Sequence, residues 1–172
     1  MKPPRIAHVG CGYWGKNLAR NFAELDALDA IVDDHRETAE RVAVATGARI
    51  VTLDEVLADP TIDGVSIATP AETHATLALG ALESGKHVYV EKPVALSLDD
   101  AEKLIDVASR NDRRLMVGHL LQYHPIFRRM REMVLSGAIG ELTYVYSNRL
   151  SLGKFRIEEN VLWSFAPHDV SM

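Results

Sequence analysis

Three glycines near the start of the chain have the spacing of a phosphate-binding loop. The segment Gly10-Cys11-Gly12-Tyr13-Trp14-Gly15 matches G-x-G-x-x-G, and it stands between a short apolar run, residues 5–9, and a helical stretch, residues 15–25. In that setting the first glycine permits a tight turn, the second lets the backbone approach a pyrophosphate, and the third lets helix and strand pack closely. The anion would lie at the helix N-terminus, where backbone N–H groups lack partners. We therefore expect a dinucleotide here, beside Tyr13 and Trp14; alternatively, Trp14 only packs the first helix.

An acidic residue stands where an adenosine ribose would need one. Asp33 ends the second predicted strand, roughly 20 residues beyond Gly10, the usual distance for a ribose-binding carboxylate. A carboxylate there accepts hydrogen bonds from the ribose hydroxyls and repels a 2′-phosphate, which favours NAD over NADP. His35 and Arg36 lie close by and would soften that preference. Two alternatives stay open at this point: Asp33 only begins a turn, or the loop belongs to an S-adenosylmethionine enzyme.

The residues that would hold a nucleotide must be positioned by the segments around them, which alternate between apolar and amphipathic runs. Strands are predicted at residues 5–9, 30–33, 49–51, 65–68, 88–90 and 115–118, and a further strand with one more polar face is predicted at 141–147. Helices are predicted at residues 15–25, 37–45, 53–58 and 71–84, from the N-cap Ser97 to about Arg110, and from Pro125 onward. Strands alternating with helices in this way are typical of an α/β fold with a doubly wound, mainly parallel sheet. We expect a Rossmann-type fold whose site lies at the carboxyl ends of the strands.

Two further segments carry a resemblance to a known family. Residues 67–74, Ile-Ala-Thr-Pro-Ala-Glu-Thr-His, and residues 85–94, Gly-Lys-His-Val-Tyr-Val-Glu-Lys-Pro-Val, are similar to segments of the glucose-fructose oxidoreductase/inositol dehydrogenase (Gfo/Idh/MocA) family. Its members are nicotinamide-dependent sugar oxidoreductases, and matching stretches run from Arg5 to about Tyr146. The E-K-P motif at residues 91–93 is more diagnostic than the glycine loop, and it disfavours a methyltransferase. The resemblance also suggests a cis Lys92–Pro93 bond.

The resemblance implies roles for the residues around the E-K-P motif. Lys92 matches a lysine that lies between the substrate hydroxyl and the nicotinamide, where a fixed ammonium stabilises the alkoxide character that develops as hydride leaves. Its alternative is a solvated lysine at the end of a strand. Glu91, and Thr69, Pro70 and His74 in the loop after the fourth strand, are implied to contact the cofactor. Pro70 could equally be the first residue of the next helix, and His74 an exposed helical histidine.

The chain departs from the family in the loop after the sixth strand. Members often carry an arginine there, whereas this chain has Leu121-Gln122-Tyr123-His124. We keep Gln122 as a candidate contact to the cofactor and Tyr123 as a candidate contact to the substrate.

A histidine near the end of the chain is the candidate acid–base residue. The segment Trp163-Ser-Phe-Ala-Pro-His168-Asp169 resembles a family segment in which an aspartate precedes a catalytic histidine by four residues. His168 matches that histidine, but Ser164 takes the aspartate position. An imidazole, with an ordinary pKa of about 6.5, suits removal of a substrate hydroxyl proton; alternatively, His168 only packs or caps a helix. Together with residues 160–163, Asn-Val-Leu-Trp, this segment more closely resembles the nucleotide-sugar branch of the family. That branch includes enzymes that oxidise the C3 hydroxyl of UDP-linked N-acetylhexosamine derivatives.

The composition excludes several classes of protein. The chain has 172 residues, 47% of them hydrophobic and 25% charged, which argues against a disordered chain. Its net charge of −5 argues against a general nucleic-acid or membrane surface, and no apolar run reaches the roughly 18–20 residues that span a bilayer. Cys11, the single cysteine, is interpreted as a small loop residue; it permits no intrachain disulfide and favours a reducing, cytoplasmic setting. The seven histidines show no metal-ligand spacing, so no metal is expected.

These observations together predict the organisation and activity of the protein. Residues 1–120 are expected to form a dinucleotide-binding domain, and residues 121–172 the truncated beginning of an α+β substrate and oligomerisation domain, short of a full domain by on the order of 150 residues. We expect an NAD-dependent oxidoreductase that moves hydride between nicotinamide and a secondary alcohol of a sugar, with a UDP-linked sugar as the narrower interpretation. The alternative is a non-catalytic NAD-binding module or an inactive fragment, and the chain alone is not expected to turn over. The resemblance implies a homo-oligomer when the chain is full length.

Overall fold

The computed structural model describes residues 3–148 and 161–172, which form two compact units. The first unit, Met1–Gly118, contains a six-stranded sheet with its covering helices, and the second, His119–Met172, contains the remaining helices. None of the helices in the described residues combines the length and hydropathy that a membrane span requires.

The sheet of the first unit is parallel throughout and doubly wound. Its strands are β1 (Ile6–Val9), β2 (Leu28–Val32), β3 (Arg49–Ile50), β4 (Gly64–Ile67), β5 (His87–Val90) and β6 (Leu115–Val117). They lie in the order β3-β2-β1-β4-β5-β6, and every neighbouring pair is parallel. The chain therefore winds outward from β1 in one direction and from β4 in the other. This reversal opens a crevice at the carboxyl ends of β1 and β4, where open α/β sheets bind ligands.

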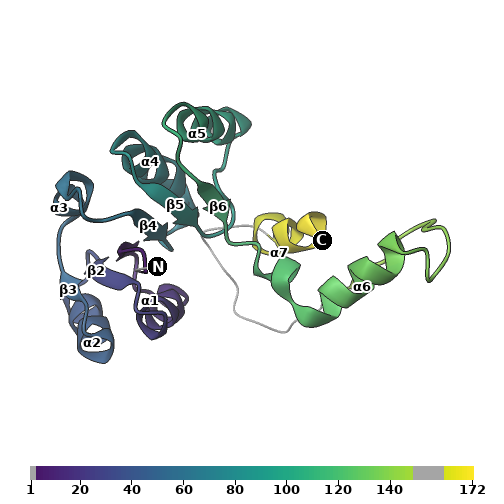
Figure 1. Cartoon of the computed structure of the whole chain (residues 1–172), viewed down its shortest axis with the longest axis horizontal. Helices are drawn as coiled ribbons and strands as arrows, with labels where there is room; N and C mark the ends of the chain where they lie inside the picture. Colours follow the sequence, from purple (N-terminus) through teal and green to yellow (C-terminus); the bar gives the residue numbers. More distant parts are fainter. Residues whose placement is uncertain (1–2, 149–160) are drawn as a thin grey trace. The chain divides into compact units, whose positions relative to one another are not determined.

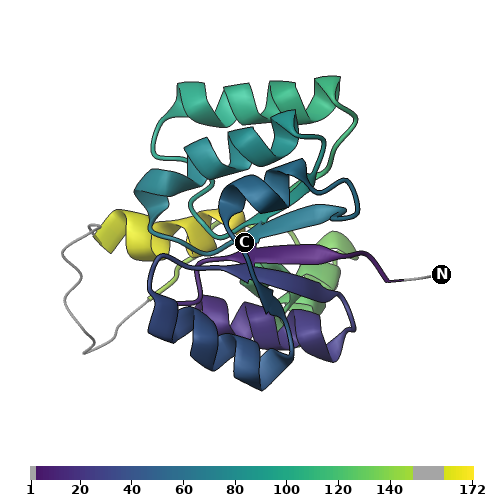
Figure 2. The same cartoon turned by 90° about the vertical axis from the view of Figure 1, so that its left-hand side faces the viewer.

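Helices cover both faces of this sheet. They are α1 (Gly15–Glu24), α2 (Arg36–Thr46), α3 (Leu53–Ala58), α4 (Ala71–Glu83) and α5 (Leu98–Arg110). Figures 1 and 2 show α1 and α2 on one face of the sheet and α4 and α5 on the other. The β-branched residues of the short strands, such as Ile67 and Val90, are fully buried between these layers and pack with Leu82 and Leu104 from the helices. Burial on both faces explains why the strands appear as continuous apolar runs rather than alternating ones.

Local signals place the helix ends close to where the sequence predicts them. The Ser97 hydroxyl accepts a hydrogen bond from the Asp100 N–H and caps α5, as expected. Gly85 follows α4 with a left-handed φ of 76°, a conformation that glycine adopts without a steric penalty. A reciprocal capping box between Thr52 and Glu55, which was not predicted, starts α3. The prediction of a doubly wound α/β fold is confirmed.

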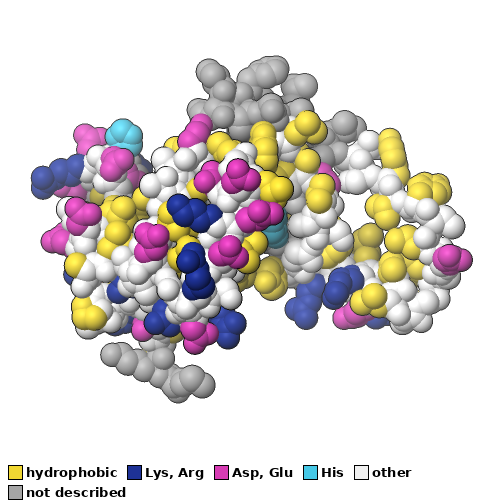
Figure 3. Space-filling view, turned by 90° about the horizontal axis from the view of Figure 1, so that it is seen from above, with side chains coloured by type: hydrophobic (Ala, Val, Ile, Leu, Met, Phe, Trp, Pro, Cys, Tyr) yellow, Lys and Arg dark blue, Asp and Glu magenta, His cyan; other side chains and the backbone are white. Residues whose placement is uncertain are grey.

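Helix α5 shows how these amphipathic segments divide their side chains. Its inner residues Leu104, Val107 and Ala108 are buried in the core. Its outer surface carries the exposed residues Asp99, Asp100, Glu102, Lys103, Asp106 and Arg110. Acidic and basic side chains are accordingly interspersed on the face of the molecule in Figure 3.

The second unit differs from the prediction in one element. It contains a short 3₁₀ helix (Leu120–Tyr123), α6 (Pro125–Leu135), with Pro125 at the helix start as expected, and α7 (Val161–Ser171). The strand predicted at residues 141–147 is wrong: residues 141–148 form no strand, and Tyr144 and Tyr146 are 81% and 78% exposed. A strand is stable only when a neighbour pairs with its backbone. Alternating hydrophobicity reports a half-buried surface but does not supply that neighbour.

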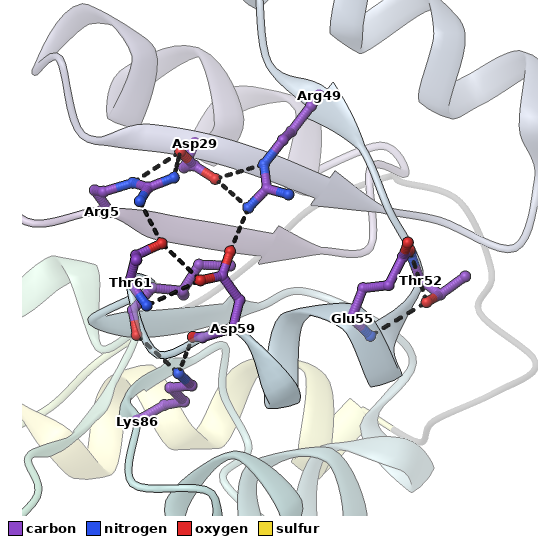
Figure 4. A network of polar contacts seen from close by, with 9 residues as sticks. Arg5, Asp29, Arg49, Thr52, Glu55, Asp59, Thr61 and Lys86 are labelled. Carbon is purple, nitrogen blue, oxygen red and sulfur yellow. Dashed lines mark hydrogen bonds and ion pairs between the residues drawn. The ribbon is translucent and has the colours of Figure 1, made fainter.

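A network of charged side chains joins the amino ends of the strands (Figure 4). Asp29 at the start of β2 accepts hydrogen bonds from Arg5 Nε at 2.9 Å and from Arg49 Nε at 2.8 Å. Arg49 also donates to Asp59 at 2.8 Å, and Asp59 accepts from the backbone N–H of Thr61 at 2.9 Å. The network fastens the segments that enter β1, β2, β3 and β4 to one another.

Lys86 completes this amino-end network from the start of β5. It is 4% exposed, and its ammonium donates to the carbonyl oxygens of Asp59 and Ile62, the latter at 3.0 Å. Charge-assisted bonds to two carbonyls satisfy an ammonium that burial would otherwise penalise.

The network makes the stability of the fold depend on pH at the acid end. Hydrogen bonds from Thr61 and Arg49 hold the pKa of Asp59 far below its ordinary value. Partial burial raises the pKa of Asp29, but hydrogen bonds from Arg5 and Arg49 outweigh this effect, so the pKa of Asp29 is also lowered. Since both carboxyls bind protons more weakly in the folded chain, we expect the free energy of unfolding to fall as the pH drops below about 4. Denaturant titrations over a pH series measure this loss.

A matched pair of variants assigns that loss to the network. Asp59→Asn removes a carboxylate from the network, and its unfolding free energy should depend less on pH in the acid range. Asp106→Asn removes an exposed carboxylate of α5 outside the network and should keep the slope of the original chain. Parallel curves for Asp59→Asn and the original chain would contradict the assignment.

Candidate functional site

The glycine loop is built so that two of its three glycines have no room for a side chain. Gly10, just after β1, donates its N–H to the Val32 carbonyl at 2.9 Å and has a left-handed φ of 92°. A Cβ on Gly10 would lie 2.8 Å from the backbone carbonyl of Ala68, and a Cβ on Gly15 would lie 1.7 Å from the Gly10 oxygen. Gly10 therefore allows the loop to lie against the segment after β4, and Gly15 allows α1 to start directly against the turn.

Gly12 differs from the other two glycines because its surroundings are open. A Cβ built on Gly12 has no protein atom within 4 Å. The helix that follows starts at Gly15 with no side-chain cap and no acidic residue in its first turn. Such a terminus keeps its positive dipole end and N–H donors for an external anion. The open space at Gly12 lies in the same loop, and the arrangement fits a pyrophosphate.

Asp33 is fixed against the glycine loop by two backbone donors. Its carboxylate accepts hydrogen bonds from the Cys11 N–H at 2.6 Å and from the His35 N–H at 2.8 Å. These bonds orient the carboxylate at the carboxyl end of β2, and each oxygen keeps a lone pair for a ribose hydroxyl. The Cys11 thiol is buried, and desolvation together with the Asp33 charge raises its pKa to about 12. It therefore stays a protonated loop residue rather than a nucleophile.

A cavity of about 450 Å³ brings together several of the predicted nucleotide-binding residues. It lies where the ends of β1 and β2 meet the glycine loop and the segment after β4, and its lining includes Gly10, Gly12, Asp33, His35, Thr69 and Pro70. Leu53 and Leu77, which were not among the predicted site residues, form an apolar part of the cavity wall. The mixture of apolar wall and a few fixed polar groups is typical of a small-molecule site.

His8 is a buried polar residue behind this loop that was not predicted from the sequence. It is fully buried in β1, with Nε2 2.9 Å from the Gly10 carbonyl oxygen and Nδ1 3.0 Å from the Ser66 hydroxyl. Burial lowers its pKa to about 4, so the ring is neutral; Nε2 donates to Gly10 and Nδ1 accepts from Ser66. A histidine within an otherwise apolar strand, two residues before the first glycine, was the available signal.

Trp14 and Glu91 bind to each other rather than lining the cavity. The Trp14 indole N–H donates to Glu91 Oε1 at 2.8 Å, and the Tyr89 hydroxyl donates to the same oxygen at 3.1 Å. Glu91 is 8% exposed, and it follows β5 directly. This contact joins the glycine loop to the segment that carries the E-K-P motif. It is a structural role, which differs from the cofactor contacts predicted for the two residues.

We expect Trp14→Phe to lower the free energy of unfolding by about 1–3 kcal/mol, because the largely buried Glu91 oxygen loses a hydrogen-bond donor. Denaturant titration followed by circular dichroism measures the change. Tyr13→Phe is the matched control in the same loop, since Tyr13 is 83% exposed and its hydroxyl makes no hydrogen bond among the described residues. Equal stability of Trp14→Phe and the original chain would show that the contact contributes nothing.

The segments after β4 and β5 meet at His74. The ring of His74 is 2% exposed, with Nδ1 2.7 Å from the Pro93 carbonyl oxygen and Nε2 2.8 Å from the Thr69 carbonyl oxygen. The alternative of an exposed helical histidine is wrong, and neither ring nitrogen is left for a direct contact to a cofactor. Pro70 is the N-cap of α4 rather than its first helical residue. The Lys92–Pro93 peptide bond is cis, as the resemblance suggested.

The remaining predicted site residues lie in the second unit. The Gln122 side-chain amide donates to the Ser171 carbonyl oxygen, and Tyr123 is 62% exposed. His168 lies in the last turn of α7. Their roles toward cofactor and substrate remain predictions. Across residues 3–148 and 161–172, no three His, Cys, Asp or Glu side chains are grouped so as to hold a metal ion.

Comparison with known proteins supports these assignments at the level of the family. A family model described as an oxidoreductase family with an NAD-binding Rossmann fold matches residues 4–119. UDP-N-acetylglucosamine 3-dehydrogenase from Acidithiobacillus ferrooxidans is 30% identical over 98% of this chain and 52% of its own length. Inositol 2-dehydrogenase from Rhizobium meliloti is 34% identical over 82% of this chain and 43% of its own length.

A solved structure agrees with the sequence relatives. The crystal structure of GenD2 from gentamicin A biosynthesis, in complex with NAD, is similar to this chain with a TM-score of 0.76 at 33% identity, and the match covers 80% of this chain and 40% of GenD2. The chain spans 33% to 57% of the length of the first curated relatives that it matches. The glycine loop, the fixed Asp33 carboxylate, the E-K-P segment and these matches together show that the chain belongs to the Gfo/Idh/MocA oxidoreductase family, with the family's NAD-binding Rossmann domain as its first unit.

Proposed function

We propose that the protein is a dehydrogenase that moves hydride between a secondary alcohol of a sugar and the nicotinamide of NAD. The observation that carries the proposal is the cavity in which the open Gly12 backbone and the fixed Asp33 carboxylate lie together. In this assignment Asp33 accepts hydrogen bonds from the adenosine ribose, and the start of α1 binds the pyrophosphate. The apolar side chains of Leu53 and Leu77 complete the wall. Nicotinamide, when bound, supplies the site that accepts or returns hydride.

The proposed chemistry assigns different tasks to Lys92 and His168. As an alcohol is oxidised, its carbon loses hydride to the nicotinamide while its oxygen loses a proton. Lys92 stabilises the negative charge that develops on that oxygen, and His168 takes the proton. In the reverse direction His168 returns the proton to the oxygen of the reduced carbonyl. Since Ser164 stands where the family segment has an aspartate, the proposal does not include a carboxylate that assists His168.

A nucleotide-linked sugar is the narrower form of this proposal. It is supported by the similarity to UDP-N-acetylglucosamine 3-dehydrogenase, which extends over 98% of this chain. We further propose that residues 121–172 begin the substrate domain and that the protein is a homo-oligomer when that domain is whole.

The second candidate function is a module that binds NAD without catalysis. It is favoured by the cavity, whose lining residues all belong to the first unit, so that binding of NAD there does not need a substrate domain. A site that needs residues of a substrate domain would bind cofactor but not react without them.

Two measurements test the proposal and separate the candidates. Fluorescence titration with NADH measures cofactor binding, and the appearance of NADH absorbance with NAD plus inositol, glucose or UDP-N-acetylglucosamine measures turnover. The dehydrogenase proposal expects saturable NADH binding by this chain and turnover of at least one sugar by the protein in which the substrate domain is whole. Binding without turnover of any sugar by the protein with a whole substrate domain favours the module, and absence of NADH binding contradicts both.

A further inference from the structure

His74 has an unusual pair of hydrogen-bond partners for a buried histidine. Its Nδ1 lies 2.7 Å from the Pro93 carbonyl oxygen, and its Nε2 lies 2.8 Å from the Thr69 carbonyl oxygen. Both partners are backbone carbonyls, which accept hydrogen bonds and cannot donate them. At 2% exposure the ring has no access to bulk water that would satisfy a nitrogen in another way.

These partners select one protonation state of the ring. A neutral imidazole has one N–H and one nitrogen lone pair, so one of its two short contacts would bring a lone pair against a carbonyl lone pair. An imidazolium has two N–H groups and satisfies both carbonyls. His8 shows the contrast within the same domain, because its second partner is the Ser66 hydroxyl, which can donate to a neutral ring. His8 and His74 thus have hydrogen-bond partners suited to opposite charge states of the ring.

The two carbonyls belong to the two segments that the family resemblance places near the nicotinamide. Thr69 is in the segment after β4 and lines the cavity, whereas Pro93 follows Lys92 directly after β5. The ring, carried by the first part of α4, is bonded to both segments at once. Moving one segment relative to the other would break a charge-assisted hydrogen bond, which is stronger than a neutral one.

We propose that His74 is held as an imidazolium that joins the segments after β4 and β5, and that it acts as a positioning residue for Lys92. The role of Lys92 rests on the proposed function; the charged state of the ring and its two bonds do not. Within the described part of the chain, no acidic side chain forms a hydrogen bond or ion pair with the ring, and Glu91, the nearest carboxylate along the chain to Pro93, bonds Trp14 and Tyr89. The positive charge is therefore balanced by backbone dipoles rather than by a carboxylate.

The protonation state is measured directly by NMR on the chain with nitrogen-15-labelled histidine. At neutral pH, we expect both ring nitrogens of His74 to have the chemical shifts of protonated nitrogens and both N–H protons to exchange slowly with water. His8 should show one protonated and one unprotonated nitrogen in the same spectrum. An unprotonated nitrogen on His74 would overturn the proposal.

Two neutral variants separate joining the segments from simple packing. The side-chain amide of asparagine can replace the Nδ1 donor, and that of glutamine can replace the Nε2 donor. His74→Asn should therefore keep the bond to Pro93 and shift the amide resonances of Thr69 and Ala71, whereas His74→Gln should shift those of Lys92 and Val94. The same pattern of shifts in both variants would show a packing role and contradict the proposal.

His87→Asn is the control, because His87 lies at the amino end of β5, where its ring accepts a hydrogen bond from the Arg114 N–H. It should leave the resonances of both segments unchanged. A last arm connects the residue to the cavity: His74→Asn, which loses the bond to the cavity-lining Thr69 segment, should bind NADH roughly tenfold more weakly than the original chain, as expected for the loss of one charge-assisted bond, whereas His74→Gln, which loses the bond beside Lys92, should keep nearly the original NADH affinity. If the NMR results hold and NADH binds none of the proteins, the proposed function fails while the inference about His74 stands. Unchanged NADH affinity in His74→Asn contradicts the role of His74 in holding the segment after β4.

Discussion

Replacing Lys92 with alanine is expected to lower kcat of the catalytically competent protein by at least about a hundredfold, the usual effect of removing a group that stabilises developing oxyanion charge. The affinity for NADH should change little, because the fixed Asp33 carboxylate and the glycine loop hold the nucleotide elsewhere in the site. Steady-state kinetics with the sugar that is turned over, together with NADH fluorescence titration, measure the two effects separately.

Lys92→Arg is not expected to restore the rate, since a planar guanidinium does not place its charge where the compact ammonium does. Lys103→Ala is the matched control, because Lys103 is an exposed residue on α5 outside the site. Near-normal kcat in Lys92→Ala would remove Lys92 from the proposed chemistry and leave the module interpretation in the stronger position.

The second large effect is expected from Gly12→Ala, which should weaken NADH binding by roughly a hundredfold, equivalent to about 2.7 kcal/mol, without lowering the stability of the chain. The reason is that a Cβ on Gly12 meets no protein atom within 4 Å but occupies the space into which the loop would receive a pyrophosphate. Fluorescence titration gives the affinity, and thermal unfolding without nucleotide gives the stability.

The neighbouring glycines provide the comparison that makes this test specific. Gly10→Ala and Gly15→Ala should both lower the thermal midpoint, because their Cβ atoms would lie within 2.8 Å and 1.7 Å of backbone atoms. Loss of binding without loss of stability should therefore be confined to Gly12→Ala. Full NADH affinity in that variant would mean that the phosphates bind somewhere else.

Local sequence patterns predicted the elements of the first unit well, because those patterns act over short distances. An apolar run of a few residues suffices to identify a strand buried on both faces, and caps such as Ser97 lie next to the helices that they start. The glycine loop and Asp33 could be paired in advance because parallel strands bring their carboxyl ends to one edge.

Contacts between distant segments could not be predicted in the same way. The sequence shows Trp14 and Glu91 as two separate candidates for the cofactor, and only the fold reveals that they bond to each other. His74 was interpreted from its place on a helix, whereas its burial depends on Pro93 and Thr69, which the helix pattern does not contain. The strand expected at residues 141–147 failed for a related reason, since pairing is a property of two segments.

The buried Cys11 thiol makes the chain a convenient host for a single chemical label. It is the only cysteine in the sequence, and with a pKa of about 12 it forms almost no thiolate near neutral pH, so maleimide-type reagents should leave it unmodified in the folded protein. A cysteine introduced at an exposed position, such as Glu102→Cys on α5, would then react alone, and a fluorophore or spin label attached there would report from one known point.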